Sequence, residues 1–191
     1  MILKLMLLSW LTHLASSAST KGDNYVQEAC NVTQYRDLCI HSLSSFSNTA
    51  KRSPSKWARA GVSVTLSESK RAAQYLLDLK KNRQMRGRDR IALSDCMECF
   101  QDAIDNLHKS LGVLRELNGA AFSAQMSDVK TWMSAVLTDV DTCLDGFDDG
   151  RGNQTSLLRN RVLKVSYITS NALALVSKLA NSSMQSQSTD P

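Results

Sequence analysis

The chain has 191 residues, of which 42% are hydrophobic, 21% charged and 6% aromatic, and its formal net charge is +5. This length fits one domain with tails, and the apolar fraction is enough for one core. With only 8 Gly and 2 Pro, the chain has too few turn-forming residues for an all-β fold. Long stretches without either residue favour long helices instead.

The first 18 residues have the pattern of a secretory signal peptide. The stretch "MILKLMLLSWLTHLASSA" has one early lysine and a short apolar run, and Ser16 and Ala18 occupy the −3 and −1 places of a cleavage site. The apolar run is shorter and more interrupted than the ~20 residues that a membrane span needs. We therefore expect cleavage after Ala18 and a secreted mature chain without a membrane anchor. Loss of Lys4 would lower the net charge from +5 to +4.

The mature chain is expected to be all-α, an antiparallel four-helix bundle stapled by disulfides. An N-terminal extension with a short hairpin covers residues 19–52, and the bundle domain covers residues 53–180. Ser53 is the predicted N-cap of the first long helix, with Pro54 as an early helical residue. The four predicted helices span about residues 54–81, 89–117, 123–144 and 156–180. Residues 181–191 lack a core pattern and predict a flexible tail.

Apolar residues in the last three segments alternate steps of three and four, which is the seam spacing of an antiparallel bundle. These positions are Leu93, Met97, Phe100, Ile104, Leu107, Leu111 and Leu114, then Met126, Val129, Met133, Val136, Val140 and Cys143, then Leu158, Val162, Val165, Thr169, Ala172, Val176 and Leu179. The first segment is less regular, with Val62, Leu66, Ala73, Leu76 and Leu77. The short turn at 118–122 makes the second and third segments antiparallel neighbours.

All five cysteines lie in the mature chain, where secretion makes them disulfide candidates. Their number alone leaves fifteen pairings open. Cys96 lies 24 residues before residue 120 and Cys143 lies 23 after it. At about 1.5 Å per residue the two cysteines have nearly the same height on neighbouring helices.

Cys99 has a similar height, but it falls at an outer heptad position, whereas Cys143 is on the seam and Cys96 is next to it. We therefore predict a Cys96–Cys143 bond and a Cys30–Cys39 bond, with Cys99 as the free thiol. A monomer is expected, and a dimer linked through Cys99 is the alternative.

Four stretches spanning about residues 25–179 carry a family resemblance: "ACNVTQYRDLC", "IALSDCMECFQDAIDNL", "DVKTWMSAVLTDVDTCLDGF" and "SYITSNALALVSKL". They resemble the plant pectin methylesterase and invertase inhibitor family. The resemblance implies an extracellular four-helix bundle with an N-terminal helical hairpin and the same two disulfides. Arg36 departs from the family, which usually has proline after the tyrosine, and Cys99 stands where a polar residue is expected.

Catalytic, redox and metal chemistry find little support in the residues. The mature chain has only two histidines, His41 and His108, far apart and expected at the surface, and neither G-x-S-x-G nor H-E-x-x-H. The C-x-x-C of Cys96 and Cys99 would suit a redox pair, but it lies within a helix. A zinc site lacks a second ligand pair. We expect no enzyme activity, cofactor or metal.

The segment "KKNRQMRGRDR" places six Lys and Arg residues within residues 80–90. Secretion argues against nucleic acid as its partner. The simplest interpretation is a solvated loop between helices. The sharper alternative is weak binding to an anionic wall polysaccharide such as demethylated pectin.

Glu98, Asp102 and Asp105 follow helical spacing and share an outer face of the second segment. Asp139, Thr142 and Asp145 lie near the end of the third segment, at about the same end of the bundle as Glu98. Acids there oppose the helix dipole without a return in stability, which points to a binding role, and an ordinary solvated face is the alternative. The resemblance implies that this region docks on the cleft of an esterase, where acids would compete with an anionic substrate.

We therefore predict a secreted inhibitor of pectin methylesterase that blocks the substrate cleft in a one-to-one complex in the cell wall. Inhibition of acid invertase is the alternative within the family, and a secreted helical module for a receptor or wall polysaccharide is the alternative of another class. Sequons at Asn31, Asn153 and Asn181 predict glycosylation.

Overall fold

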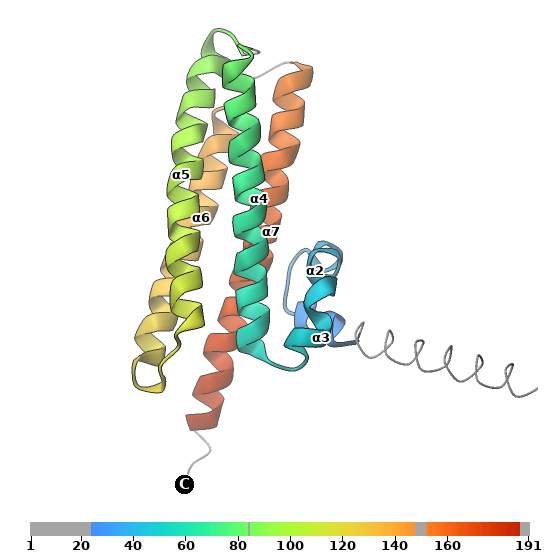
Figure 1. Ribbon diagram of the computed structural model, residues 1–191, viewed down its shortest axis with the longest axis vertical. Helices are drawn as coiled ribbons and strands as arrows, with labels where there is room; N and C mark the ends of the chain where they lie inside the picture. Colours follow the sequence, from blue (N-terminus) through green and yellow to red (C-terminus); the bar gives the residue numbers. More distant parts are fainter. Residues whose placement is uncertain (1–23, 84, 148–151, 188–191) are drawn as a thin grey trace, which may run out of the picture.

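The computed structural model describes residues 24–83, 85–147 and 152–187, except for the side chains of 183–187. Every regular element in these ranges is helical, and the predicted all-α bundle is confirmed. The four long helices are α4 (Pro54–Lys81), α5 (Arg88–Arg115), α6 (Phe122–Asp145) and α7 (Asn153–Gln187), which run up and down side by side (Figure 1). Each helix packs on two neighbours, in the order α4, α5, α6, α7 and back to α4. The predicted signal peptide lies outside the described residues.

The start of α4 has the cap that its sequence predicts. Ser53 has an extended backbone, and its hydroxyl accepts a hydrogen bond from the Lys56 amide at 3.4 Å. Pro54 follows as the first helical residue, where its missing N–H leaves no donor unsatisfied. At the other end, Arg83 takes a positive φ of 49° just after the C-cap, and this left-handed residue ends the helix.

The predicted tail is wrong over residues 181–187, because α7 continues to Gln187. No Gly or Pro interrupts this polar stretch. Once a helix is nucleated, each added residue contributes one hydrogen bond, so a polar segment can extend it without a core contact. Among the described side chains of the helix, Leu179 is the last buried apolar one. Residues 188–191 lie outside the described part.

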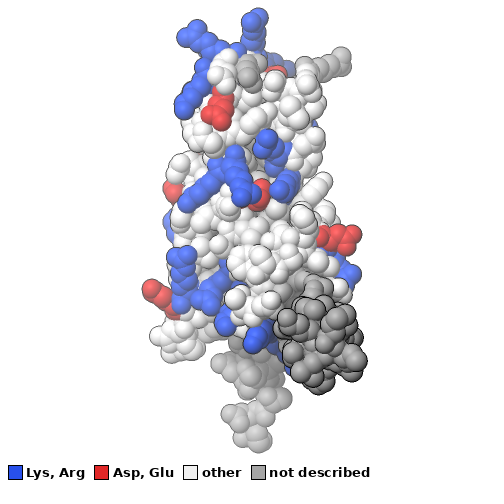
Figure 2. Space-filling view, turned by 45° about the vertical axis from the view of Figure 1, so that its right-hand side comes forward, with Lys and Arg blue, Asp and Glu red and all other residues white. Residues whose placement is uncertain are grey.

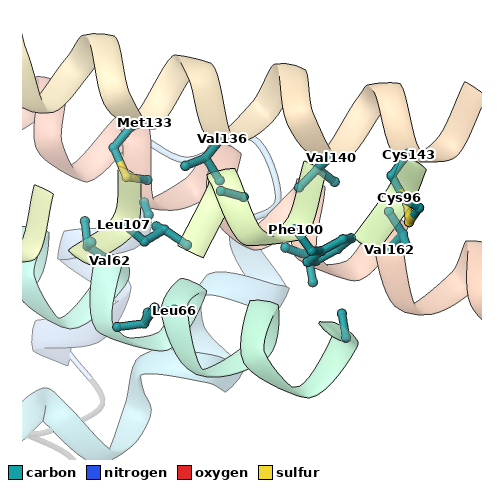
Figure 3. Close-up of a cluster of buried hydrophobic side chains, with 14 of the residues drawn as sticks. Val62, Leu66, Cys96, Phe100, Leu107, Met133, Val136, Val140, Cys143 and Val162 are labelled. Carbon is teal, nitrogen blue, oxygen red and sulfur yellow. A yellow bond between two sulfur atoms is a disulfide. The ribbon is translucent and has the colours of Figure 1, made fainter. Parts of the chain in front are cut away.

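One core runs through the whole bundle. Figure 3 shows Met133, Val136, Val140 and Cys143 in a row along the inner face of α6. All the predicted seam residues of α6 and α7 are buried, as the periodicity requires. The prediction for α4 needs correction, because Leu77 is 38% exposed and the face is completed by the buried Thr65, Ser69, Ala72 and Leu79. Thr65 enters the core because its hydroxyl donates to the carbonyl of Gly61 at 3.0 Å.

The N-terminal hairpin lies beside the lower half of α4 and α7 (Figure 1). Residues 24–30 are helical, and α2 (Arg36–Leu43), the 3-10 turn η1 (Ser44–Phe46) and α3 (Ser47–Ala50) follow. Cys30 is bonded to Cys39, with the two Cα atoms 5.8 Å apart. Both cysteines belong to a second apolar cluster that includes Trp57 of α4 and Leu175 of α7.

A buried asparagine attaches the hairpin loop to the bundle. The Asn171 side chain accepts from the Tyr35 amide at 3.0 Å and donates to the Tyr35 carbonyl at 2.9 Å. The Tyr35 ring also stacks on Tyr167, with centroids 4.1 Å apart. The side chain of Asn171 thus satisfies both backbone groups of a loop residue, which fixes the hairpin against α7.

Candidate functional site: an acidic face on α5 and α6

The candidate site is built on α5 and α6, which are joined by a short and well-braced turn. Asn118 caps the 3-10 turn η2 (Gly119–Ala121) by accepting from the Ala120 amide at 3.0 Å. Gln125 accepts from the Asn118 amide at 2.9 Å and donates to the Glu116 carbonyl at 3.2 Å. These bonds hold the two helices antiparallel at their lower end.

At the upper end, the disulfide between Cys96 and Cys143 joins the same two helices, with a Cα separation of 4.4 Å. This is the pairing expected from the sequence, and both cysteines are buried (Figure 3). A Cβ atom built on Gly146 would lie 3.3 Å from the Cβ of Ala92, so the end of α6 passes close to the start of α5. Arg159 of α7 donates to the Leu144 carbonyl at 3.2 Å, which places a cation at the negative end of α6.

The five residues proposed for target binding are all exposed: Glu98, Asp102, Asp105, Thr142 and Asp145. The Thr142 hydroxyl donates to the Thr138 carbonyl at 2.8 Å, and Asp105 accepts from Gln101 at 3.3 Å. Within the described residues, Glu98, Asp102 and Asp145 have neither a hydrogen bond nor an ion pair through their side chains. We refer to these five residues as the acidic face. Most of its carboxylates therefore make no hydrogen bond or ion pair that would stabilise the fold.

Asp139 is the residue that the predicted set omits, although it lies on α6 one turn before Thr142 and Cys143. It is half-buried, and its Oδ2 atom is buried without a hydrogen-bond partner. Burial raises the pKa of Asp139, and the negative charge of Asp102 raises it further. The effect of Asp102 of α5 on Asp139 of α6 places these two carboxylates within electrostatic range of each other.

Cys99 follows Glu98 on α5, within electrostatic range of Asp139 and Asp102, and is in no disulfide. The expectation of an outward thiol is corrected, because Cys99 is half-buried and packs against the bundle core. The pKa of the Cys99 thiol is raised mainly by burial and next by the negative charge of Asp139, with smaller effects from Asp102 and Asp95. A backbone hydrogen bond lowers this pKa but does not offset the rise. A thiol held in its neutral form is a poor nucleophile, so this environment does not favour redox chemistry.

The remaining candidates stay apart from one another. His41 and His108 are both exposed, as are the sequon residues Asn31, Asn153 and Asn181. No set of three or more potential metal ligands comes together in the described ranges. Across that part of the molecule, none of the helices has the length and apolarity to cross a membrane.

Comparison with known proteins identifies the architecture. Residues 24–175 match the profile of the family described as "Plant invertase/pectin methylesterase inhibitor". The chain belongs to this family. As a member of an inhibitor family it is not an enzyme, which confirms that prediction.

Two relatives from Arabidopsis thaliana illustrate how far the inhibitor-family similarity extends. Pectinesterase inhibitor 6 is 49% identical over 164 residues, which cover 84% of this chain and 78% of the relative. Pectinesterase inhibitor 9 is 34% identical over 188 residues, covering 92% of each. Among solved structures, a mutant form of a pectin methylesterase inhibitor from Arabidopsis aligns with a TM-score of 0.64 at 20% identity, covering 78% of this chain and 92% of that one. This structural likeness supports the fold of the family.

Proposed function

We propose that this protein inhibits pectin methylesterase by covering the substrate cleft in a one-to-one complex. The observation that carries the proposal is the acidic face, whose carboxylates are exposed on two helices held together by a disulfide. Pectinesterase inhibitors are among its relatives. Proteins dock best through surfaces that need little reordering, because fewer degrees of freedom are lost on binding. A braced pair of helices provides such a surface.

Charge complementarity explains why the acids would face the esterase. The substrate of a pectin methylesterase is a methyl-esterified polygalacturonate chain, and every ester that reacts leaves a carboxylate, so the chain becomes a polyanion as the reaction proceeds. A cleft that accommodates this polyanion is expected to favour negative charge, so carboxylates on a rigid surface can compete for it. Glu98, Asp102 and Asp105 would contact the cleft from α5, and Thr142 and Asp145 from α6. The carboxylates of Glu98, Asp102 and Asp145 have no hydrogen-bond or ion-pair partner among the described residues, and Asp105 accepts one hydrogen bond from an exposed glutamine of its own helix.

The test replaces Asp102, Asp105 and Asp145 together with Asn and measures inhibition of a purified pectin methylesterase. A charge-assisted contact contributes about 1–3 kcal/mol when it is desolvated, and much less at a rim. One such contact already weakens inhibition by about tenfold. The matched control replaces Asp78 and Asp128 with Asn and Glu116 with Gln, which removes three charges from other exposed positions.

The acid triple variant should therefore inhibit at least about tenfold less well than the control triple, with unchanged circular dichroism and a melting temperature no lower than that of wild type, because Asp102 repels the Asp139 carboxylate. Equal inhibition by the two folded variants would show that the acids are only a solvated face. The binding surface would then have to be sought on α7 or the hairpin.

The family description also names invertase, so acid invertase remains a second candidate target. A titration of the secreted protein against a panel of both enzyme classes, with residual activity as readout, separates the two. We place the protein outside the cell, in the wall, on the strength of the predicted signal peptide. The half-buried position of Cys99 favours a monomer, which non-reducing electrophoresis tests.

A further inference from the structure

A basic hollow lies at the upper end of the bundle, where α4 ends and α5 begins. Its cavity volume is about 1140 Å³, larger than the roughly 300–1,000 Å³ typical of small-molecule pockets. Lys80, Arg83, Arg86 and Arg90 line it, and they come from the segment that the sequence marks as basic. Figure 2 shows Lys and Arg side chains projecting at this end of the molecule. We call these four side chains and the space between them the basic hollow.

The cations of the hollow are not neutralised by the fold. All four side chains are exposed, and no carboxylate of the described residues forms an ion pair with any of them. Elsewhere in the bundle, by contrast, two cations are paired: Glu68 forms ion pairs with Arg71 at 2.7 Å and with Lys164 at 3.2 Å. Asp95 is the acid in the lining of the hollow, so positive charge prevails there four to one.

The walls of the hollow also have apolar parts. Met85 is buried beside the charged residues, although it belongs to the connection between two helices. Ile91 is 65% exposed on the first turn of α5, next to Arg90. A ligand that suits this lining carries several negative charges spaced along a chain whose backbone can lie against apolar side chains. A single small anion would use only part of it.

We propose that the basic hollow binds the carboxylates of a polyuronate chain, the de-esterified form of the polysaccharide. The choice of a polyuronate rests on the proposed function, because carboxylates are what a pectin methylesterase produces from methyl esters. Such a chain would be attracted to the hollow and repelled by the acidic face. The inhibitor would thereby be held on wall regions where the esterase has already acted, while α5 and α6 stay available for the enzyme.

The test compares three forms of the secreted protein for binding to a de-esterified oligogalacturonate and to its fully methyl-esterified counterpart. One variant replaces Lys80, Arg86 and Arg90 with Gln. The control replaces Lys70, Lys109 and Lys130 with Gln, three exposed lysines with no ion pair in the described part. Both variants lose three positive charges, so a difference between them reports the position of the charge. Inhibition of a soluble esterase is measured in parallel.

We expect the wild type and the control variant to bind the de-esterified chain and not the esterified one, and salt to weaken this binding. The hollow variant should bind the de-esterified chain at least about tenfold more weakly than the control variant does. Equal binding by the two variants, or equal binding of the esterified chain, would overturn the proposal. If only the hollow variant lost inhibition, the basic hollow would be a contact surface for the esterase, and this result would also overturn the proposal. Polyuronate binding by a wild type that inhibits no esterase would refute the proposed function while leaving this inference standing.

Discussion

Replacing Asp139 with Asn should stabilise the protein at neutral pH. The carboxylate is half-buried, its Oδ2 atom has no partner, and Asp102 lies within electrostatic range. A buried polar atom without a partner costs about 1–3 kcal/mol when neutral and more when charged, so the amide removes only the extra cost of the charge. Because solvent still reaches part of Asp139, we expect a gain near the lower limit, about 1 kcal/mol, for the neutral amide.

The pH dependence of this gain has a defined sign. The pKa of Asp139 is raised in the folded protein, so the folded state holds its proton more tightly than the unfolded state does. The contribution of the protonated carboxyl to stability is therefore fully present below the unfolded value of about 3.9 and is lost as pH rises through the raised pKa. The difference between Asp139→Asn and wild type should consequently shrink as the solution is acidified.

Urea unfolding of both proteins at neutral pH and near pH 3 measures this difference. Asp141→Asn serves as the control, because it removes one charge from an exposed position of the same helix. A variant that is less stable than wild type at neutral pH, or a gain that persists undiminished in acid, would refute the reasoning.

Two further outcomes follow from the geometry. Asn171→Ala removes both hydrogen bonds to Tyr35 and should loosen the hairpin by about 2 kcal/mol, seen as faster hydrogen exchange in α2 while exchange within α5 is unchanged; equal acceleration in both would contradict a local role. Cys99 should react slowly with a thiol reagent at neutral pH and faster in Asp139→Asn, because losing a neighbouring negative charge lowers the pKa of the thiol. An unchanged rate would show that burial alone controls the thiol.

The helices of the bundle could be predicted from the sequence because their core positions are mostly apolar and regularly spaced. The seam residues of α7, from Leu158 to Leu179, illustrate this regularity, and all of them are buried. The face of α4 could not be predicted as well, because Thr65 and Ser69 occupy core positions. A hydroxyl that bonds to its own helix, as Thr65 does to Gly61, is polar in the sequence but can be buried in the structure.

The environment of the acidic face was harder to predict than its residues. Helical spacing is enough to place Glu98, Asp102 and Asp105 on one side of α5. The partial burial of Asp139 and Cys99 depends on how α6 lies against α5, which is a property of the packed pair. The hydrogen bond between Asn171 and Tyr35 joins residues 136 positions apart, so no local sequence pattern predicts it.

The sign of the charge changes along α5, and this separates the two proposed surfaces. Arg90 lies in its first turn and Asp102 twelve residues later, about 18 Å along the axis at 1.5 Å per residue. The screening length at physiological ionic strength is about 8 Å, so an exposed charge at one position has little effect at the other. A polyanion at the hollow would therefore leave the attraction of Asp102 and Asp105 for a cationic cleft nearly intact. Asp145 lies nearer to the hollow, because the residue after it, Gly146, passes close to Ala92 at the start of α5. Screening thus separates the hollow from the part of the acidic face farther along α5.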